Sequence, residues 1–521
     1  MAQEMDSTLN FTLGPDANLL PELQGVLDGF IHGYDQGIPK HGIGALRWFT
    51  PENHSSAVLA RDKIHASISQ EVESQANVRT SPLGLVVNAD GKMRPINDLS
   101  FPKKDLTIPS VNSFVNKSHF ETTWDDFNIV TEFFRQNDGQ FDLALFDWEK
   151  AYRQVPTRMD QWPFLMVQDL DGGLFIDTRI TFGAVAGCGS FGIPADAWKR
   201  IMTHEFDVEK IFRWVDDNLF VKRSSKSFSI RDIVSRSLEL GVQTNEEKCS
   251  DFSIEQKFIG FVWNGRDSTV RLPKPKLEQR ITQIEVFLVP KAEFKYNDAE
   301  VLAGRLNHVS YLLPQLRAYL RGVYRWMNEW KKKMATRTVP ADVISDLAFW
   351  RESLLNFEHT RLVQSCEEKE LNWVGDASTG FGIGVLIGHR WCQFRMKETW
   401  REGTPSRGIA WLETVAIRLG VLMLIELHLV AKGTNCVVWT DNTVTQATLV
   451  SKKSKDAFVN DEWKIIQTLL ITNQLDITPK RVASKDNRAD ALSRGIQKPH
   501  VKENRVWVDI PNDLVPFLFH A

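Results

Sequence analysis

Short hydrophobic runs alternate with polar segments along most of the chain, and the period of this pattern changes with position. Between residues 141 and 265, runs rich in Val, Ile and Phe are separated by polar turns, which predicts β-strands. Residues 275–358 instead repeat hydrophobic side chains at three-to-four spacing, which predicts helices. Strand-like runs return from about Cys366 and are followed by helical patterns. The pattern therefore predicts a multidomain chain of α/β and α+β class.

The change of pattern near residues 360–370 marks the clearest expected domain boundary. At roughly 150 residues per domain, the 521 residues of the chain predict three or four structural units. The segments that we expect are an N-terminal helical extension at 1–75, three central segments at 76–140, 141–265 and 266–365, a C-terminal domain at 366–500 and a tail at 501–521.

Composition and charge narrow the class of protein. With 42% hydrophobic and 25% charged residues the chain is typical of globular proteins, and its net charge of −3 excludes a uniformly basic coat. The five cysteines are scattered without CxxC spacing, which favours a reducing compartment over a disulfide scaffold or a zinc finger. The polar N-terminus and the shortness of the longest apolar stretch, 419–425, predict no membrane partner and an intracellular location, in the cytoplasm or the nucleus.

Three aspartates interrupt the predicted strands of the central region. Asp147 ends one hydrophobic run, and Asp216 and Asp217 lie between two others, 211–215 and 219–221. Hydrophobic hairpins usually turn on Gly or Asn, since adjacent carboxylates cost desolvation and repel each other. A divalent cation removes that cost, and Mg²⁺ prefers carboxylate oxygens. The pattern thus indicates a metal site for phosphoryl transfer, with a solvated acidic hairpin as the alternative.

Five segments around these aspartates resemble, in order, motifs A to E of a reverse transcriptase palm. They read FDWEKAYRQV, TFGAVAGCGSFG, FRWVDDNLFV, LGVQTNEEKC and KFIGFVWNG. Upstream, GKMRPINDLSFP resembles the fingers segment, and DLSFP together with Ser110-Val111-Asn112 is similar to DIRS-like retrotransposon enzymes. The resemblance extends over roughly residues 81–494. It implies a right-hand polymerase with fingers at 76–140, a palm at 141–265 and a thumb or connection at 266–365.

The resemblance also implies roles for individual residues. Asp147, Asp216 and Asp217 would bind two Mg²⁺ ions, for which Mn²⁺ could substitute. Tyr152 occupies the steric-gate position, where its ring would exclude a ribonucleotide 2′-OH; a core tyrosine is the alternative. Lys248 would donate a proton to pyrophosphate, although a surface ion pair is also consistent with its position. The other candidates are Lys92, Arg94, Phe182 and Gly183 for nucleotide binding and Phe258, Ile259 and Gly260 for a primer grip.

The sequence departs from the family pattern at two positions. Trp214 stands where Tyr usually precedes Val-Asp-Asp, so a hydroxyl is lost there. Pro194 comes later after Phe-Gly than the family's proline does, so the nucleotide contacts of residues 182–191 do not carry over from the resemblance in detail.

A basic run follows in the predicted helical region. The run contains six basic residues and one acidic residue, Glu329, and the aromatic residues Tyr324, Trp326 and Trp330 lie among them. This composition is typical of a helix that binds along a phosphate backbone. A solvated helix face is the alternative. The basic residues are Arg321, Arg325, Lys331, Lys332, Lys333 and Arg337.

Four acids recur in the C-terminal region at the ends of predicted strands and on helical patterns. They are Asp376, Glu413, Asp441 and Asp490. Their order, with ADALSR around the last, resembles a retroelement ribonuclease H, which implies a mixed-sheet domain and two further Mg²⁺ ions. The segment RVASKDNRAD lacks the histidine that often precedes the last aspartate, so Lys485 or solvent would have to carry the proton.

Together these resemblances imply an RNA-directed DNA polymerase with ribonuclease H activity that copies retroelement RNA into DNA. Its partners would be an RNA template, a DNA primer, the RNA–DNA hybrid and deoxynucleoside triphosphates. One alternative is an inactive or domesticated element that binds nucleic acid without catalysis, against which the presence of all seven acids argues. The other is an RNA-templated RNA polymerase, against which Tyr152 and the fused nuclease argue.

Overall fold

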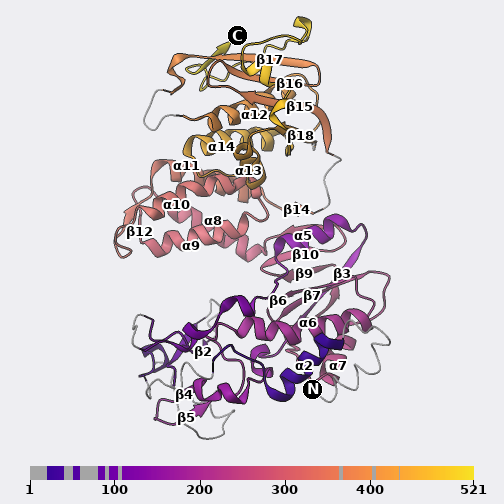
Figure 1. Cartoon of the computed structure of the whole chain (residues 1–521), viewed down its shortest axis with the longest axis vertical. Coiled ribbons are helices and arrows are strands. Elements are labelled where there is room, and N and C mark those ends of the chain that lie inside the picture. The colour runs from indigo at the N-terminus through magenta and orange to yellow at the C-terminus, as the bar shows by residue number, and fades with distance from the viewer. Residues whose placement is uncertain are drawn as a thin grey trace. The chain divides into compact units, whose positions relative to one another are not determined.

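The structure is a computed structural model, and it describes residues 20–39, 51–58, 80–87, 93–103, 108–362, 368–401, 407–432, 434–473 and 475–521. Lys92 and Cys366 lie outside the described residues. The chain divides into two compact units, Met1–Asp267 and Ser268–Ala521. Both units combine helices with β-sheets, which confirms the mixed α/β class (Figure 1).

The first unit is built around a four-stranded antiparallel sheet. Its strand order is β6-β7-β3-β8, with bounds β3 Phe141–Asp147, β6 Lys210–Trp214, β7 Asp217–Arg223 and β8 Ser250–Ser253. Along β3, Ala144 and Phe146 belong to the main hydrophobic core, whereas Phe141 packs against Phe133 from helix α5 (Phe127–Gln136). Because neighbouring side chains on a strand point to opposite faces, both faces of this sheet are covered.

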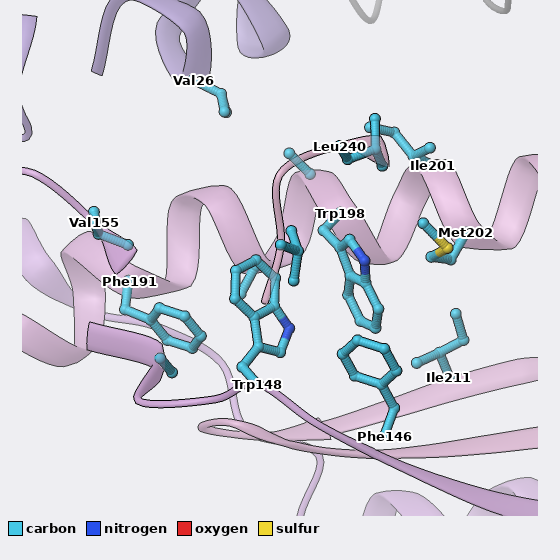
Figure 2. Packing of buried hydrophobic residues seen from close by; sticks show 14 of the residues in the cluster. Val26, Phe146, Trp148, Val155, Phe191, Trp198, Ile201, Met202, Ile211 and Leu240 are labelled. Carbon is cyan, nitrogen blue, oxygen red and sulfur yellow. The ribbon is translucent and has the colours of Figure 1, made fainter. Parts of the chain in front are cut away.

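The main core of the first unit lies between the sheet and three helices, α2 (Leu20–His32), α6 (Gly187–Glu205) and α7 (Ile230–Glu239). Trp198 of α6 packs on Phe146 with ring centroids 4.6 Å apart and edge-on to Trp148 at 5.6 Å (Figure 2). The Trp198 indole also donates a hydrogen bond to Ser237 Oγ at 3.0 Å, so its polar atom is satisfied in the core. This packing fixes the end of β3 beside α6.

Smaller elements complete the first unit. Strands β1 (Leu83–Val87) and β2 (Met93–Asn97) pair antiparallel, with Leu83 opposite Asn97. The others are α3 (Ser55–Val58) and two hairpins, β4 (Met166–Gln168) with β5 (Leu174–Ile176), and β9 (Glu255–Phe258) with β10 (Phe261–Asn264).

The second unit begins with the helices that the sequence predicted for residues 275–358. Their bounds are α8 Lys274–Phe287, α9 Tyr296–Val309, a 3₁₀ helix Pro314–Leu320, α10 Arg321–Asn328 and α11 Ala341–Leu355. The short strands β11 (Thr269–Arg271) and β14 (Thr360–Arg361) pair with each other and flank these helices in sequence. The strands β12 (Glu293–Phe294) and β13 (Arg337–Thr338) also pair, and each lies between two of the helices in sequence. Trp326 and Trp350 are fully buried among them.

A six-stranded mixed sheet forms the rest of the second unit. Its order is β19-β18-β15-β16-β17-β20, with bounds β15 Lys369–Ala377, β16 Gly382–Ile387, β17 Arg390–Met396, β18 Asn435–Thr440, β19 Asp476–Arg481 and β20 Leu518–His520. Strands β15, β18 and β19 are parallel, and the remaining pairs are antiparallel. Strand β20 comes from the segment that the sequence analysis treated as a tail.

Helix α12 (Ile409–Glu426) packs on this sheet and on α14 (Ala457–Asn473); α13 (Thr443–Ser451) and α15 (Asp490–Ser493) are shorter. Within the described ranges, no helix combines the length and the apolar character needed to cross a membrane.

The helices and the sheet of the second unit are joined through α14. Lys464 forms an ion pair with Asp346 of α11 at 2.7 Å, and the Lys464 carbonyl accepts a hydrogen bond from Tyr319 Oη at 3.1 Å. Asn460 Nδ2 donates to the Ala318 carbonyl at 2.9 Å. These contacts explain why both regions belong to one compact unit.

Candidate active sites

The first acidic group lies where β3, β6 and β7 meet. Asp147 is the last residue of β3 and Asp217 the first of β7, and the two are direct partners in the antiparallel ladder. Strands β6 and β7 are joined by the two residues Val215 and Asp216, with Trp214 opposite Asp217. Val215 has a φ of +57°, a strained conformation for a β-branched residue. A positive φ is usual at the first residue of a two-residue hairpin loop, but Gly, Asn or Asp normally supplies it, so the valine before Asp216 is the unusual feature of this turn.

Backbone hydrogen bonds hold Asp147 in this position. The Trp148 amide donates to the Asp216 carbonyl at 3.3 Å, and the Asn245 amide donates to the Asp147 carbonyl at 2.9 Å. The segment around Asn245 also carries Lys248, whose Nζ lies 2.8 Å from Asp147 Oδ2. Lys248 therefore lies beside the acids, as the resemblance implies, and it also forms an ion pair, as the alternative expected.

The three aspartates carry more negative charge than the neighbouring ammonium group of Lys248 can balance. Burial raises the pKa of Asp216, and the charge of Asp147 raises it further. Partial burial and the interaction with the Asp147 carboxylate raise the pKa of Asp217 to about 7. Burial alone would lower the pKa of Lys248, but its hydrogen bond to Asp147 and the charges of the three aspartates raise it overall.

These carboxylates fit a divalent cation. Asp147 is 2% exposed, and its Oδ1 has no hydrogen-bond partner among the described residues. An unpartnered buried carboxylate oxygen is unfavourable, and a hard cation is the ligand that satisfies it.

A cavity of about 690 Å³ opens beside the acids in the first unit. Its lining includes Asp147 and Asp216 together with hydrophobic residues such as Leu83, Val167 and Phe175. The residues predicted from the sequence that line this one cavity are Arg94, Asp147, Tyr152, Phe182, Asp216 and Lys248.

Tyr152 forms part of the cavity wall. Its ring stacks on Phe182 with centroids 5.3 Å apart and an interplanar angle of 30°, and it lies 5.5 Å from Phe191. Its Oη is 2.8 Å from Cys188 Sγ. Burial and this hydrogen bond raise the pKa of Tyr152, so the phenol stays protonated.

Glycine is required at position 183 because two backbone segments approach each other closely there. Its φ is +119°, and a Cβ at this position would lie 2.0 Å from the carbonyl oxygen of Asn97. The Asn97 amide donates to the Phe182 carbonyl at 2.9 Å. Asn112 fixes the same segment by donating to the Gly183 carbonyl at 2.8 Å and accepting from the Val185 amide at 3.0 Å.

The primer-grip candidates are outside the cavity lining. Phe258 is 2% exposed, and its carbonyl accepts a hydrogen bond from the Trp263 indole at 3.1 Å. Ile259 and Gly260 form the turn between β9 and β10, both with positive φ. Only this turn, and not the Phe258 side chain, is partly accessible at the surface.

The basic run does not form one continuous basic helix. Helix α10 ends at Asn328, so Lys331, Lys332 and Lys333 lie beyond it. Arg325 pairs with Asp342 at 2.5 Å, and Arg337 pairs with Glu329 at 2.8 Å. The prediction of one basic helix along a phosphate backbone is therefore wrong in the length of the helix. In addition, carboxylates neutralise two arginines of the basic run.

Other members of the basic run also have partners within the second unit. Lys333 lies over the Tyr296 ring at 4.2 Å, and Arg321 Nε donates to the Lys455 carbonyl at 3.2 Å. Lys331 and Lys332 are exposed.

The second acidic group lies on the six-stranded sheet and α12. Carboxylate oxygens of Asp376 in β15, Glu413 in α12 and Asp441 after β18 all lie within 4.8 Å of one another. Because β15 and β18 are parallel neighbours, their carboxyl ends meet at one edge of the sheet, which brings Asp376 and Asp441 together.

Burial dominates the electrostatics of this group. It raises the pKa of Glu413 to about 9, with further contributions from the charges of Asp376 and Asp441. It also raises the pKa of Asp376 to about 6, against a hydrogen bond from Ser493 that lowers it. A divalent cation would offset the mutual repulsion of three carboxylates clustered in this way.

Asn487 and Ser493 contact these acids and were not predicted from the sequence. Asn487 Nδ2 donates to Asp376 Oδ1 at 2.8 Å and to Asp441 Oδ1 at 3.2 Å, and Ser493 Oγ donates to Asp376 Oδ2. The sequence signal that could have identified them is that both lie in the same short segment as Asp490.

Asp490, the fourth acid, is not among the three clustered residues. It begins α15, and its carboxylate accepts from Arg494 Nε at 2.9 Å. Ser493 Oγ contacts both the Asp490 carbonyl oxygen and Asp376 Oδ2, so Asp490 lies near the group. Lys485 is exposed in the short 3₁₀ turn Ser484–Asp486.

Comparison with known proteins gave structural neighbours only. No family model matches the chain, and a search of curated proteins found no match. Among solved structures, the chain is similar to a foamy viral protease-reverse transcriptase dRH in complex with double-stranded DNA (14% identity, TM-score 0.47, 92% of this chain and 81% of that one).

Two further structures of the foamy viral protease-reverse transcriptase are similar. The complex with an RNA/DNA hybrid has 13% identity and a TM-score of 0.49, with 98% of this chain covered; this chain spans 65% of that one. The complex with double-stranded DNA has 13% identity and a TM-score of 0.47, over 92% of this chain and 97% of that one.

Proposed function

We propose that the chain is an RNA-directed DNA polymerase with ribonuclease H activity, from a DIRS-like retroelement. The observation that carries this proposal is that each compact unit gathers carboxylates from distant parts of the sequence into one acidic group. Such groups are unfavourable without cations and suit in-line phosphoryl transfer. Two groups in one chain fit two reactions on one nucleic acid, synthesis of DNA and hydrolysis of RNA.

In the polymerase site, an incoming deoxynucleoside triphosphate would occupy the cavity beside Asp147 and Asp216. Asp147, Asp216 and Asp217 would hold two Mg²⁺ or Mn²⁺ ions, which supply charge stabilisation at the phosphoryl group when bound. Arg94 lines the same cavity and would bind phosphate oxygens with its planar fork.

The primer 3′-hydroxyl would lose its proton to a water molecule and attack the α-phosphorus. A new P–O bond would form, the bond between the α-phosphorus and the bridging oxygen would break, and pyrophosphate would leave. Lys248 holds a proton on Nζ next to Asp147 and would pass it to the leaving pyrophosphate. Tyr152 would limit the space at the sugar, because its ring is fixed between Phe182, Phe191 and Cys188.

In the nuclease site, Asp376, Glu413, Asp441 and Asp490 would hold the cations, and a water molecule would hydrolyse a phosphodiester of the RNA strand. Asn487 would fix the relative position of Asp376 and Asp441, because it donates to both. Lys485 is exposed and lies two positions before Asn487 in the sequence. It would donate a proton to the leaving oxygen.

The domain assignment is part of the proposal. The antiparallel sheet β6-β7-β3-β8 supports a palm at 141–265, and the mixed sheet supports a ribonuclease H domain at 366–500. Fingers at 76–140 would carry Arg94, and a thumb or connection at 266–365 would contact the primer and the RNA template. The exposed Lys331 and Lys332 are the surface proposed for this contact. The Ile259–Gly260 turn of the palm is proposed as the primer grip.

Two assays test the proposal directly. The purified full chain should extend an oligo(dT) primer on poly(rA) with Mg²⁺ and deoxythymidine triphosphate, and it should cleave the RNA strand of a labelled RNA–DNA hybrid. A chain that binds the hybrid but performs neither reaction would instead be a nucleic-acid-binding remnant. Extension with ribonucleotides at the same efficiency would indicate an RNA polymerase.

A further inference from the structure

Strand β20 carries an exposed aromatic residue beside an exposed arginine. Phe519 of β20 is 40% exposed and is the direct ladder partner of Arg395 in β17, which is also exposed. The Arg395 guanidinium carbon lies 6.0 Å from the centroid of the Phe519 ring and 5.9 Å from that of the Phe381 ring. No carboxylate among the described residues pairs with Arg395. Its positive charge is therefore available at the surface, next to two aromatic rings.

The sheet register places this pair on the same face as the acidic group of the second unit. Asp376 is opposite Gly384 in β16, whereas Arg395 is opposite Gly382, two residues away along the same strand. Directly opposed residues share a face, and so do residues two apart on one strand, so Asp376, Arg395 and Phe519 lie on one face of the sheet. From the spacing of strands and residues, Arg395 is roughly 12 Å from Asp376, and Phe519 is roughly 16 Å from it.

Phe381 connects this pair to the segment that holds the acids. It lies in the turn between β15 and β16, and its ring packs against Gly495, where an added Cβ would be 2.8 Å from ring atoms. Gly495 comes two residues after Ser493, the last residue of α15, which donates to Asp376. Phe381, Arg395 and Phe519, called here the β20 surface, therefore form a continuous surface that begins beside the acidic group.

We propose that the β20 surface binds unpaired nucleotides that continue from an RNA–DNA hybrid beyond the nuclease site, a role that rests on the proposed function of the second acidic group. The charge of Arg395 suits a phosphate, and the face of an exposed ring stacks on a base of any identity. Bases within a duplex are already stacked on each other, so exposed rings favour an unpaired strand. Because a strand advances about 3.4 Å per nucleotide along a duplex axis, the surface is only a few nucleotides from the acids.

Either strand of the hybrid could supply these nucleotides, as an RNA 3′ extension or a DNA 5′ extension. Both extensions leave the duplex at the same end, and neither is the RNA 5′ extension that a polymerase would copy. The binding chemistry of phosphate and stacked base is common to both. The experiment therefore has one arm for each source.

The test measures binding of the full chain to three labelled RNA–DNA hybrids by fluorescence anisotropy, in EDTA so that no strand is cleaved. One hybrid is blunt, one carries a short RNA 3′ extension and one carries a short DNA 5′ extension. The parent should bind at least one extended hybrid more tightly than the blunt hybrid. Phe519→Leu keeps an apolar side chain but removes the ring, so it should weaken binding of that extended hybrid on the order of tenfold and bind the blunt hybrid as the parent does.

Arg395→Gln tests the charge of the same surface independently. It leaves both rings in place and should also weaken binding of the extended hybrid. Because one fewer phosphate contact is made, the slope of log affinity against log salt concentration should fall by roughly one.

Trp507→Leu is the matched control. Trp507 is 58% exposed, and its ring lies 4.0 Å from the Arg505 guanidinium and edge-on to His520 at 5.1 Å. His520 directly follows Phe519 in β20, so its side chain, and with it the Trp507 ring, lies on the other face of the sheet. The control removes an exposed ring beside an arginine and should bind all three hybrids as the parent does.

The outcomes separate the two proposals. A parent that gains no affinity from either extension, or a Phe519→Leu chain that keeps the gain, overturns the inference. Equal losses on blunt and extended hybrids also overturn it, because the ring would then act on the duplex. If the thermal midpoint of Phe519→Leu falls, Arg395→Gln decides. A parent that does not cleave the blunt hybrid in Mg²⁺ contradicts the nuclease function, while the extension arms still test the β20 surface.

Discussion

Asp147 and Asp217 face each other as direct partners across the ladder between β3 and β7. Directly opposed residues of an antiparallel pair have Cβ atoms only about 5 Å apart, and like charges in this position are destabilising. Partial burial and the Asp147 carboxylate accordingly raise the pKa of Asp217 to about 7. A shift of one residue in register would send one of the two to the other face, so the strand pairing itself builds this acidic group.

The first prediction concerns the acidic turn. Asp216→Asn should reduce primer extension on the order of 10³-fold, because a ligand charge at the proposed metal site is lost. The thermal midpoint should not fall, since burial already disfavours the charge of Asp216. Asp251→Asn, at an exposed aspartate of β8, is the control and should extend at the parent rate. Equal rates for the Asp216 variant and the parent would refute the metal site.

The second prediction concerns the sugar of the incoming nucleotide. Tyr152→Val should lower the preference for dATP over ATP in single-nucleotide extension on the order of tenfold or more, because the ring no longer fills the cavity wall. Tyr152→Phe keeps the ring and its stacking on Phe182 but loses the contact with Cys188, so it should retain the preference. An unchanged ratio in the valine variant would mean that Tyr152 only packs.

The third prediction separates the two activities. Asp441→Asn should stop cleavage of the RNA strand in a labelled hybrid and spare primer extension, because Asp441 belongs to the acidic group of the second unit. Asp216→Asn should have the reverse effect. Asp509→Asn, at an exposed aspartate of the second unit, should keep both activities. Normal cleavage by Asp441→Asn would leave the C-terminal domain as a hybrid-binding module.

The fourth prediction concerns stability. Gly183→Ala should lower the free energy of unfolding by at least about 2 kcal/mol, because the new Cβ meets the Asn97 carbonyl and the φ of +119° is strained for alanine. Gly25→Ala in α2 is the control, with nothing within 4 Å of the added Cβ. This control should gain about 0.5–1 kcal/mol from the helix propensity of alanine. Chemical denaturation of both variants measures the difference, and equal stability would argue against the close approach.

The sequence correctly grouped charged residues that the fold brings together from distant parts of the chain. Asp147, Asp216 and Lys248 were predicted together, and they line one cavity. Asn487 was missed, because the role of a carboxamide depends on the residues that lie near it in space. Asn487 bonds to Asp376, 111 residues away in the chain.

The extent of the basic helix was also mispredicted. A count of positive charges does not reveal that Arg325 and Arg337 are paired with Asp342 and Glu329. Strand β20 was missed as well, because three residues at the end of a chain carry too short a pattern to predict a partner strand.

The contacts between α14 and the preceding helices bear on how the chain can be divided. A cut at residues 360–370, where the sequence pattern changes, would leave Asp346 without Lys464 and the Ala318 carbonyl without Asn460. Each fragment would then expose surface that the intact unit buries, and both would be prone to aggregate. Any fragment made for separate expression should therefore keep helices α8, α9, α10 and α11 together with the mixed sheet of the second unit.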